Sequence, residues 1–167
     1  MYTDLNKIKL MLGYILLVLV LISVWTELLV GQIMYWDSNF GPIVLPSIAS
    51  KNQVSEGSSY ANLSIDGDVE ISAENSATAQ LSCAGDTLIT EYKLTFDGDG
   101  SSATGGSGTN YETYDTFLTT AAPVRHKIGD DDVQVTLHVK ASNYANDLAN
   151  AGTYMATQTL TAHWAGH

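Results

Sequence analysis

The stretch VQVTLHVKA, residues 133–141, alternates apolar and polar residues without a break. One face would carry Val133, Val135, Leu137 and Val139, and the other would carry Gln134, Thr136, His138 and Lys140. Successive side chains of a β-strand point to opposite faces of the sheet. The stretch therefore predicts a strand with one buried and one solvated face.

Shorter runs of the same kind lie before it, separated by residues that favour turns. Leu63, Ile65, Val69 and Ile71 alternate with polar residues around Asp66-Gly67, a dipeptide typical of a tight hairpin turn. Residues 79–83 place Ala79, Leu81 and Cys83 on one face, which points the thiol toward a core. Residues 88–96 and 111–118 are two more expected strands, and the Gly/Ser-rich residues 97–108 between them predict a flexible loop.

The last run, TYMATQTLTAHW at residues 153–164, has the longest alternation in the chain. Its expected inward face comprises Tyr154, Ala156, Gln158, Leu160, Ala162 and Trp164. Threonine, which favours strands, occupies much of the other face. With several short strands and no crossover helices, the sequence predicts an all-β domain built as a sandwich of antiparallel sheets.

The net charge of the chain argues against one class of partner. The formal net charge is -11 for 167 residues, and all of the excess acid lies after Trp36. Nucleic-acid binding is driven largely by Lys and Arg, so this balance argues against it. Cys83 is the only cysteine, which excludes an intrachain disulfide and cysteine-based metal motifs.

Residues 1–26 have the layout of a signal peptide or a membrane anchor. Lys7 and Lys9 precede an apolar run that continues to Trp25, a length between a signal core and a spanning helix. If the membrane-spanning helix continued past Trp25, Glu27 would lie inside the bilayer. Tyr35 and Trp36 would then suit the membrane–water interface. Both interpretations predict export, to the cell surface or an extracellular filament.

No motif predicts catalysis, a cofactor or a metal site. The four histidines, His126, His138, His163 and His167, follow no zinc-binding spacing, and we interpret them as surface residues. The acidic stretches at 97–100 and 129–132 lack the distant Glu of a calcium loop, which favours acidic turns. The chain has no Gly-x-Ser-x-Gly elbow and no phosphate-binding loop, so we expect no enzyme.

The closing run resembles the last strand of chaperone-usher pilins of the spore coat protein U type. Gly152, Thr153 and Tyr154 match that strand by identity, and Leu160, Ala162 and Trp164 take its inward places. The stretches NFGPIVLP, TAQLSCAGDTLITEYKLTFDGDG and DVQVTLHVKA are also similar to the family. The chain departs from it in lacking a partner for Cys83 and in having Ala156 where Asp is usual.

The resemblance implies an immunoglobulin-like fimbrial domain that lacks one strand, which a neighbouring subunit supplies from its N-terminal extension. The domain would span 39–167, and residues 27–38 would be the extension, with Leu29, Gly31, Ile33 and Tyr35 on one face of the donor strand. Tyr154, Leu160, Ala162 and Trp164 would border the acceptor groove. The implied partners are other copies of the chain or related subunits, an assembly chaperone and an outer-membrane usher.

Two other functions are compatible with the sequence. One is a membrane-anchored β-sandwich that acts in binding or adhesion and completes its fold with its own chain. The other is a type IV-like pilin whose hydrophobic helices form the filament core. The leader of that class has a basic stretch that ends in Gly or Ala directly before the hydrophobic helix, with a Glu a few residues into the helix. The sequence does not fit it, because Gly13 lies four residues after Lys9 and Glu27 comes much too late.

Overall fold

The structure, a computed structural model, describes residues 32–97, 106, 108–127, 129, 132–145 and 148–165. By its internal contacts the chain divides into Met1–Gln32 and Ile33–His167, and the second unit contains the fold described below. The predicted signal peptide or anchor at residues 1–26 lies outside the described residues. Among those that are described, no helix has the length and apolar character needed to cross a bilayer.

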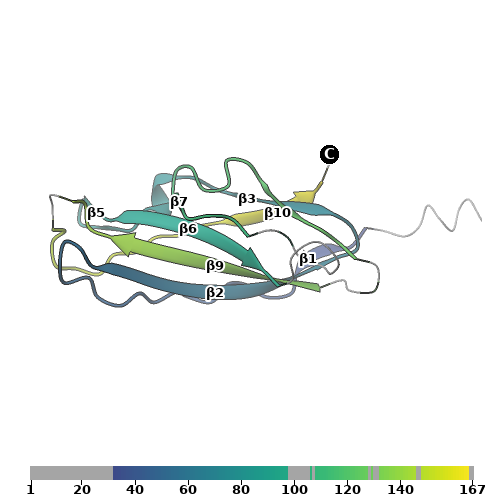
Figure 1. Cartoon of the computed structure of the whole chain (residues 1–167), viewed down its shortest axis with the longest axis horizontal. Coiled ribbons are helices and arrows are strands. Elements are labelled where there is room, and N and C mark those ends of the chain that lie inside the picture. Colours follow the sequence, from purple (N-terminus) through teal and green to yellow (C-terminus); the bar gives the residue numbers. More distant parts are fainter. Residues whose placement is uncertain are drawn as a thin grey trace, which may run out of the picture. The chain divides into compact units, whose positions relative to one another are not determined.

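The described chain is all-β, as the sequence predicts (Figure 1). Its strands are β1 (Met34–Trp36), β2 (Val54–Ile65), β3 (Val69–Ala73), β4 (Ser82–Cys83), β5 (Asp86–Thr87), β6 (Ile89–Phe96), β7 (Glu112–Thr113), β8 (Ala122–Val124), β9 (Asp132–Ser142) and β10 (Leu160–Trp164). A single 3₁₀ turn, Ala77–Ala79, is the only helical element in this part of the chain. One sheet has the order β1-β2-β9-β6-β7 and a second has the order β10-β3-β8, while β4 and β5 form a separate hairpin.

Long antiparallel pairings hold the larger sheet together. β9 lies between β2 and β6, and its register aligns Val135 with Ala61 on one side and with Phe96 on the other. The four residues predicted to face inward from β9 are all buried, as is Ala141 on the same face, whereas the side chains on the other face are exposed or half-buried. This confirms the predicted half-buried strand.

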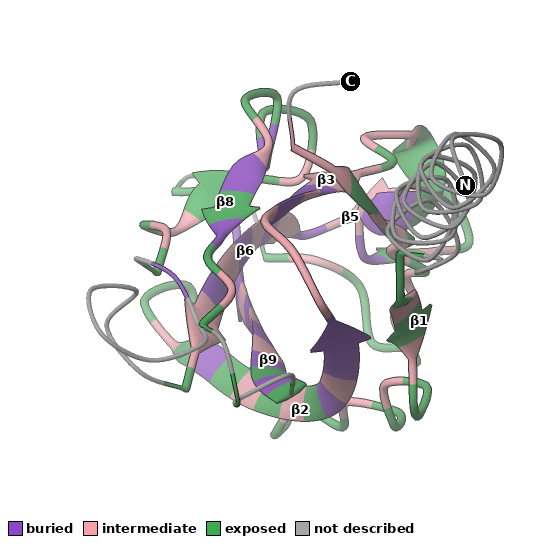
Figure 2. Ribbon diagram, turned by 90° about the vertical axis from the view of Figure 1, so that its right-hand side faces the viewer, coloured by how far each residue is buried: buried purple, intermediate pink, exposed green. Residues whose placement is uncertain are grey.

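The core lies between the two sheets, and the ribbon in Figure 2 shows buried residues on strands of both of them. Leu63, Ile65, Val69, Ile71 and Leu94 are completely buried in one cluster. Each aliphatic side chain removed from water in this way contributes about 1.5–3 kcal/mol to folding. A second, smaller cluster around Leu81, Leu88 and Ala141 lies beyond it.

The structure corrects the predicted hairpin at Asp66-Gly67. β2 ends at Ile65 and β3 begins at Val69, but the two strands belong to different sheets and do not pair. The chain instead turns a corner, because the apolar residues on both sides of the turn must reach the same core from opposite layers. The predicted inward face of Leu63, Ile65, Val69 and Ile71 is nevertheless confirmed.

Two other expected strands are largely turns. In residues 111–118 only β7 is strand, and the following turns bury Phe117 and Leu118. The run predicted at 79–83 begins at the last residue of the 3₁₀ turn and ends with the short strand β4. β4 meets β5 through Ala84 and Gly85, which have φ angles of 51° and 96° and make the left-handed two-residue turn that suits a hairpin.

Candidate functional site: two free strand edges

β10 has a free edge in the smaller sheet. Its partner is β3: Glu74 N–H donates to Thr159 C=O at 3.0 Å, and Ala165 N–H donates to Asp68 C=O at 3.0 Å. Backbone groups of successive residues in a strand point to opposite sides, so odd-numbered positions face β3. The backbone groups of Leu160, Ala162 and Trp164 therefore face the free edge, where the described chain places no strand.

The side chains of the same three residues point inward and are only half-buried. Leu160, Ala162 and Trp164 pack against the main core, while Thr161 and His163 face solvent. Upstream, Tyr154, Ala156 and Gln158 are half-buried and the residues between them are exposed. The predicted alternation is confirmed from 153 to 164, although regular pairing covers only β10 and a single bridge between Met155 and Ser82.

In the larger sheet, no other strand of the described residues pairs with the outer edge of β1. Asp66 N–H donates to Ile33 C=O at 3.1 Å and Asp37 N–H donates to Asn62 C=O at 2.9 Å, so the odd-numbered positions face β2. Met34 and Trp36 direct their backbone groups to the other side, and their half-buried side chains pack against the main core. Trp36 also packs on Phe40, with ring centroids 5.5 Å apart.

The two free edges lie on the same side of the sandwich. Figure 2 shows β8 on the left of β3 and β1 on the right. Because β10 pairs with the edge of β3 opposite β8, it lies on the side of β1. The short strands β7 and β8 occupy the opposite edges of their sheets.

Residues 39–49 continue from β1 along β2 without forming a ladder. Ile43 Cγ2 and Leu45 Cδ2 lie 2.8 and 2.9 Å from the position that a Cβ on Gly57 would occupy, so only glycine allows their close approach. Pro46 C=O accepts a hydrogen bond of 2.7 Å from the buried Ser55 hydroxyl. Leu45 and Tyr154 both pack against the second apolar cluster.

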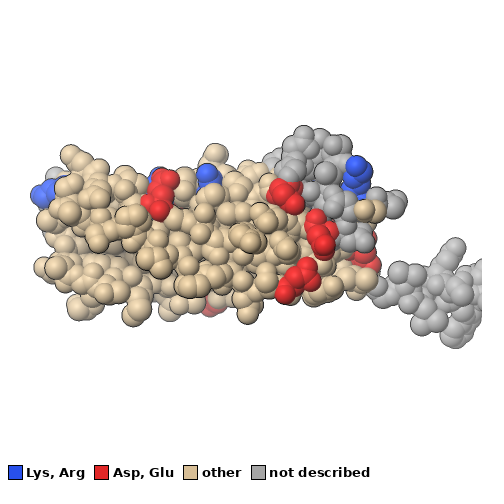
Figure 3. Space-filling view, turned by 90° about the horizontal axis from the view of Figure 1, so that it is seen from below, with Lys and Arg blue, Asp and Glu red and all other residues tan. Residues whose placement is uncertain are grey.

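The free edges lie in parts of the chain with few charges. Lys51 is the only charged residue between Asp37 and Glu56, and residues 148–165 contain no Asp, Glu, Lys or Arg. Figure 3, which views the side of the domain next to β2, shows acidic side chains gathered toward one end and most of this face uncharged. A second strand would therefore meet little charge repulsion here, on a chain whose net charge is -11.

The predicted donor residues fall in two places. Leu29 and Gly31 lie outside the described residues. Ile33 and Tyr35 are 50% and 55% exposed on the outer side of β1, and it is Met34 and Trp36 that pack against the core. In this arrangement β1 pairs with β2 of its own chain, and the role of the segment as a donor to another copy stays a prediction.

On the outer face of the larger sheet, charged side chains of β6 and β9 are paired with one another and with Tyr111. Lys93 and Lys140 place their Nζ atoms 4.8 and 4.5 Å from the ring centroid of Tyr111, and Lys140 pairs with Glu91 at 2.7 Å. Burial and the neighbouring carboxylates raise the pKa of Tyr111. These contacts are cross-strand side-chain pairs of the kind that stabilise a sheet, and they do not indicate a binding site.

The described histidines do not converge. His138 Nε2 lies 2.8 Å from Thr95 Oγ1 on the larger sheet, and burial followed by the charge of Lys93 lowers its pKa. His163 lies on the smaller sheet, 3.7 Å from Glu70. Within the described ranges, no group of three or more His, Cys, Asp or Glu is arranged to hold a metal ion.

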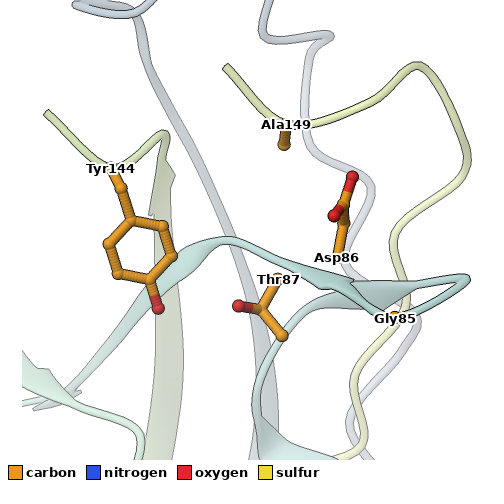
Figure 4. Close-up of a pocket in the computed structure, with 5 residues that line it drawn as sticks. All are labelled: Gly85, Asp86, Thr87, Tyr144 and Ala149. Carbon is orange, nitrogen blue, oxygen red and sulfur yellow. The ribbon is translucent and has the colours of Figure 1, made fainter. Parts of the chain in front are cut away.

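A small pocket of about 140 Å³ lies at the β4–β5 end of the domain (Figure 4). It is lined by Gly85, Asp86, Thr87, Tyr144 and Ala149. The Asp86 carboxylate already accepts a hydrogen bond of 3.0 Å from the N–H of Asn150, and the Tyr144 hydroxyl accepts one from Gln80 Nε2. Ligand pockets usually enclose about 300–1,000 Å³, so this pocket does not define a binding site.

The fold and the edges define the class of the protein as an antiparallel β-sandwich with two free strand edges on one side. Comparison of the chain with protein-family models, curated proteins and solved structures found no match in any of the three.

Proposed function

We propose that the protein is a structural subunit of an extracellular fibre, assembled when a strand from one copy occupies the free edges of β1 and β10 in another. The observation that carries the proposal is the coincidence of two properties in the same residues. Leu160, Ala162 and Trp164 have backbone groups directed at a free edge and apolar side chains that are incompletely buried. An added strand would hydrogen-bond to these backbone groups and would cover these side chains.

The strand order supports an immunoglobulin-like assignment. Constant-type immunoglobulin domains pair strands in the order A-B-E-D in one sheet and place C, F and G in the other. Taken in chain order, β1-β2-β9-β6 corresponds to A-B-E-D, and the pair β3-β10 corresponds to C-F. Strand G would lie beyond β10, at the edge that the described residues leave open.

The test is to recover the full chain from the cell surface, weigh it by mass spectrometry, and run it on a gel in SDS without boiling. Strand-exchanged polymers would give a ladder that resists SDS and collapses on heating, because unfolding each subunit is needed to release its neighbour. Loss of about the first 25 residues would identify removal of the signal peptide. A single monomer band before heating would overturn the proposal.

A second function is favoured by the pairing of β1 within its own chain. Met34–Trp36 already lies on β2, and Ile43 and Leu45 cover the surface beside Gly57. A self-contained sandwich of this kind would act as a binding or adhesion module held at the membrane by its N-terminal segment. It predicts that the chain without residues 1–32 is a stable monomer, whereas the fibre proposal predicts that this truncated chain aggregates.

A further inference from the structure

Residues 39–49, which follow β1, lie against the inner face of β2, and we call this segment the strap. Ser59 Oγ is 3.4 Å from the position that a Cβ on Gly41 would occupy. Further along the strap, the side chain of Ile43 lies over Gly57. The inward positions of β2 beside the strap are all small, namely Ser55, Gly57 and Ser59. Small residues leave space beneath β2, and the strap fills it.

The strap is held by apolar side chains and not by a β-ladder. Phe40, Ile43 and Leu45 pack against the main core. Among the described residues, no backbone–backbone hydrogen bond joins the strap to β2. Pro42 and Pro46 disfavour such a ladder, because proline has no N–H to donate. The strap therefore covers the core at this edge without using the backbone groups of β2.

The strap runs beside a stretch of β2 edge that lacks a strand partner. Asn62 C=O accepts from Asp37 N–H, so the even-numbered residues of β2 direct their backbone groups to the side of β1. Glu56, Ser58 and Tyr60 share this direction and lie beyond the three residues that pair with β1. On that side, no backbone group of the described chain pairs with them. Because the strap continues β1 along the same edge of β2, it lies on the open side of the sandwich.

We infer that the strap is a placeholder, which fills the open side of the unassembled subunit and is displaced when a strand is added there. The inference rests on the proposed function and concerns how its site is closed before assembly. An added strand with alternating apolar residues would replace the apolar contacts of the strap. It would also form backbone hydrogen bonds to a free strand edge, which the strap does not, so the exchange favours the added strand.

The test is a disulfide that fixes the strap on β2, made by Gly41→Cys and Ser59→Cys in the full chain with Cys83→Ala. The 3.4 Å between Ser59 Oγ and the Cβ position of residue 41 fits a disulfide, whose Cβ atoms lie about 3.5–4.5 Å apart. Glu91→Cys with Thr113→Cys is the matched control, because these residues face one another on β6 and β7, at the opposite edge of the sheet. Each variant is refolded in mild neutral detergent, with or without reductant. After free thiols are blocked, its SDS-resistant ladder is compared with that of the Cys83→Ala chain.

With reductant present, we expect both variants to give the same ladder as the Cys83→Ala chain. Oxidation should weaken the ladder of the strap variant at least tenfold, because a fixed strap leaves no room for an added strand, and should leave the control unchanged. Equal ladders from the oxidised and reduced strap variant would overturn the inference and leave the proposed function standing. Absence of a ladder from the wild-type chain would overturn both.

A second measurement does not depend on how well the oxidised variant folds. Polymers of the strap variant are formed in reductant and then oxidised, and the disulfide between positions 41 and 59 is measured by mass spectrometry. Most monomers treated in the same way should contain this disulfide. Polymers should contain it at least tenfold less often, because their straps have left β2. A similar disulfide content in monomers and polymers would contradict displacement of the strap.

Discussion

At the scale of single residues, Thr90 tests how the buried end of β6 is held. Thr90 is 1% exposed, and its hydroxyl accepts the N–H of Leu81 at 3.0 Å and donates to Leu88 C=O at 3.1 Å. Thr90→Val keeps the shape but leaves the N–H of Leu81 without a partner and removes one of the two hydrogen bonds to Leu88 C=O, which still accepts from Gln80 Nε2. We expect the free energy of unfolding, measured by urea denaturation, to fall by about 1–3 kcal/mol.

Thr136→Val is the matched control for this change. Thr136 is half-buried on the outer face of β9, and its hydroxyl makes no hydrogen bond to the described residues. Its replacement should alter the free energy of unfolding by less than about 0.5 kcal/mol. If both variants lose the same amount, the Thr90 hydroxyl does not hold the β4–β6 connection.

Tyr92 gives a pH-dependent prediction. Its ring is 2% exposed, its hydroxyl donates to Ala79 C=O at 2.6 Å, and burial raises its pKa from 10.0 to about 12. Above pH 10 the unfolded chain loses this proton first, so the native state loses stability as the pH rises from 10 to 12. Tyr92→Phe should remove up to about 3 kcal/mol of that decline in the free energy of unfolding. Tyr60→Phe, which changes an exposed ring, should leave it unaltered.

Individual burial is also what the sequence predicts best. Val133, Val135, Leu137 and Val139 are buried as expected, because alternation is a property of neighbouring residues and a strand has a fixed period. The same reasoning identifies Leu160, Ala162 and Trp164 as inward residues. Cys83 is only half-buried, since β4 is a short hairpin strand outside both main sheets.

At the scale of elements, the free edge of β10 can be blocked without removing its pairing to β3. The N–H of Ala162 faces the free edge, whereas the N–H of Thr161 faces β3. Proline is tolerated in a strand only where its missing N–H would not have joined the ladder. Ala162→Pro should therefore keep the fold, with a loss of about 1 kcal/mol or less, and abolish the SDS-resistant ladder.

Thr161→Pro is the counterpart that should damage the sheet itself, because it removes a hydrogen bond to β3 and leaves a backbone acceptor unpaired, with a loss of about 1–3 kcal/mol in the free energy of unfolding. The two variants differ by one position and carry the same substitution. A ladder that persists in Ala162→Pro at wild-type intensity would show that the edge of β10 is not where a second copy binds. Comparable unfolding of both variants would contradict the assigned direction of the backbone groups.

Pairing between elements is where prediction from sequence fails. Asp66-Gly67 has the local chemistry of a hairpin turn, yet β2 and β3 enter different sheets because each finds its partners far along the chain, at β9 and at β8 and β10. The pairing of β1 with β2 has no local signal either. Residues 27–38 alternate in a way that suits a donor strand, and alternation does not state which edge a strand will join.

At the scale of the whole molecule, the two proposed functions differ in what completes the sandwich. In a fibre the open side between β1 and β10 is filled by another copy, and residues 27–38 are the predicted donor. A synthetic peptide of residues 27–38 should then compete for this side. Added in excess while the full chain refolds, it should convert the SDS-resistant ladder into monomers.

The control peptide carries Leu29→Asp and Ile33→Asp, which place charges on the expected inward face and should abolish competition, since an unpaired buried carboxylate is costly. If both peptides leave the ladder unchanged, residues 27–38 are not the donor, although another segment can still form the fibre. If both dissolve it, the effect is not specific to the apolar face. Only competition by the native peptide alone assigns the N-terminal extension to the open side of a neighbouring copy.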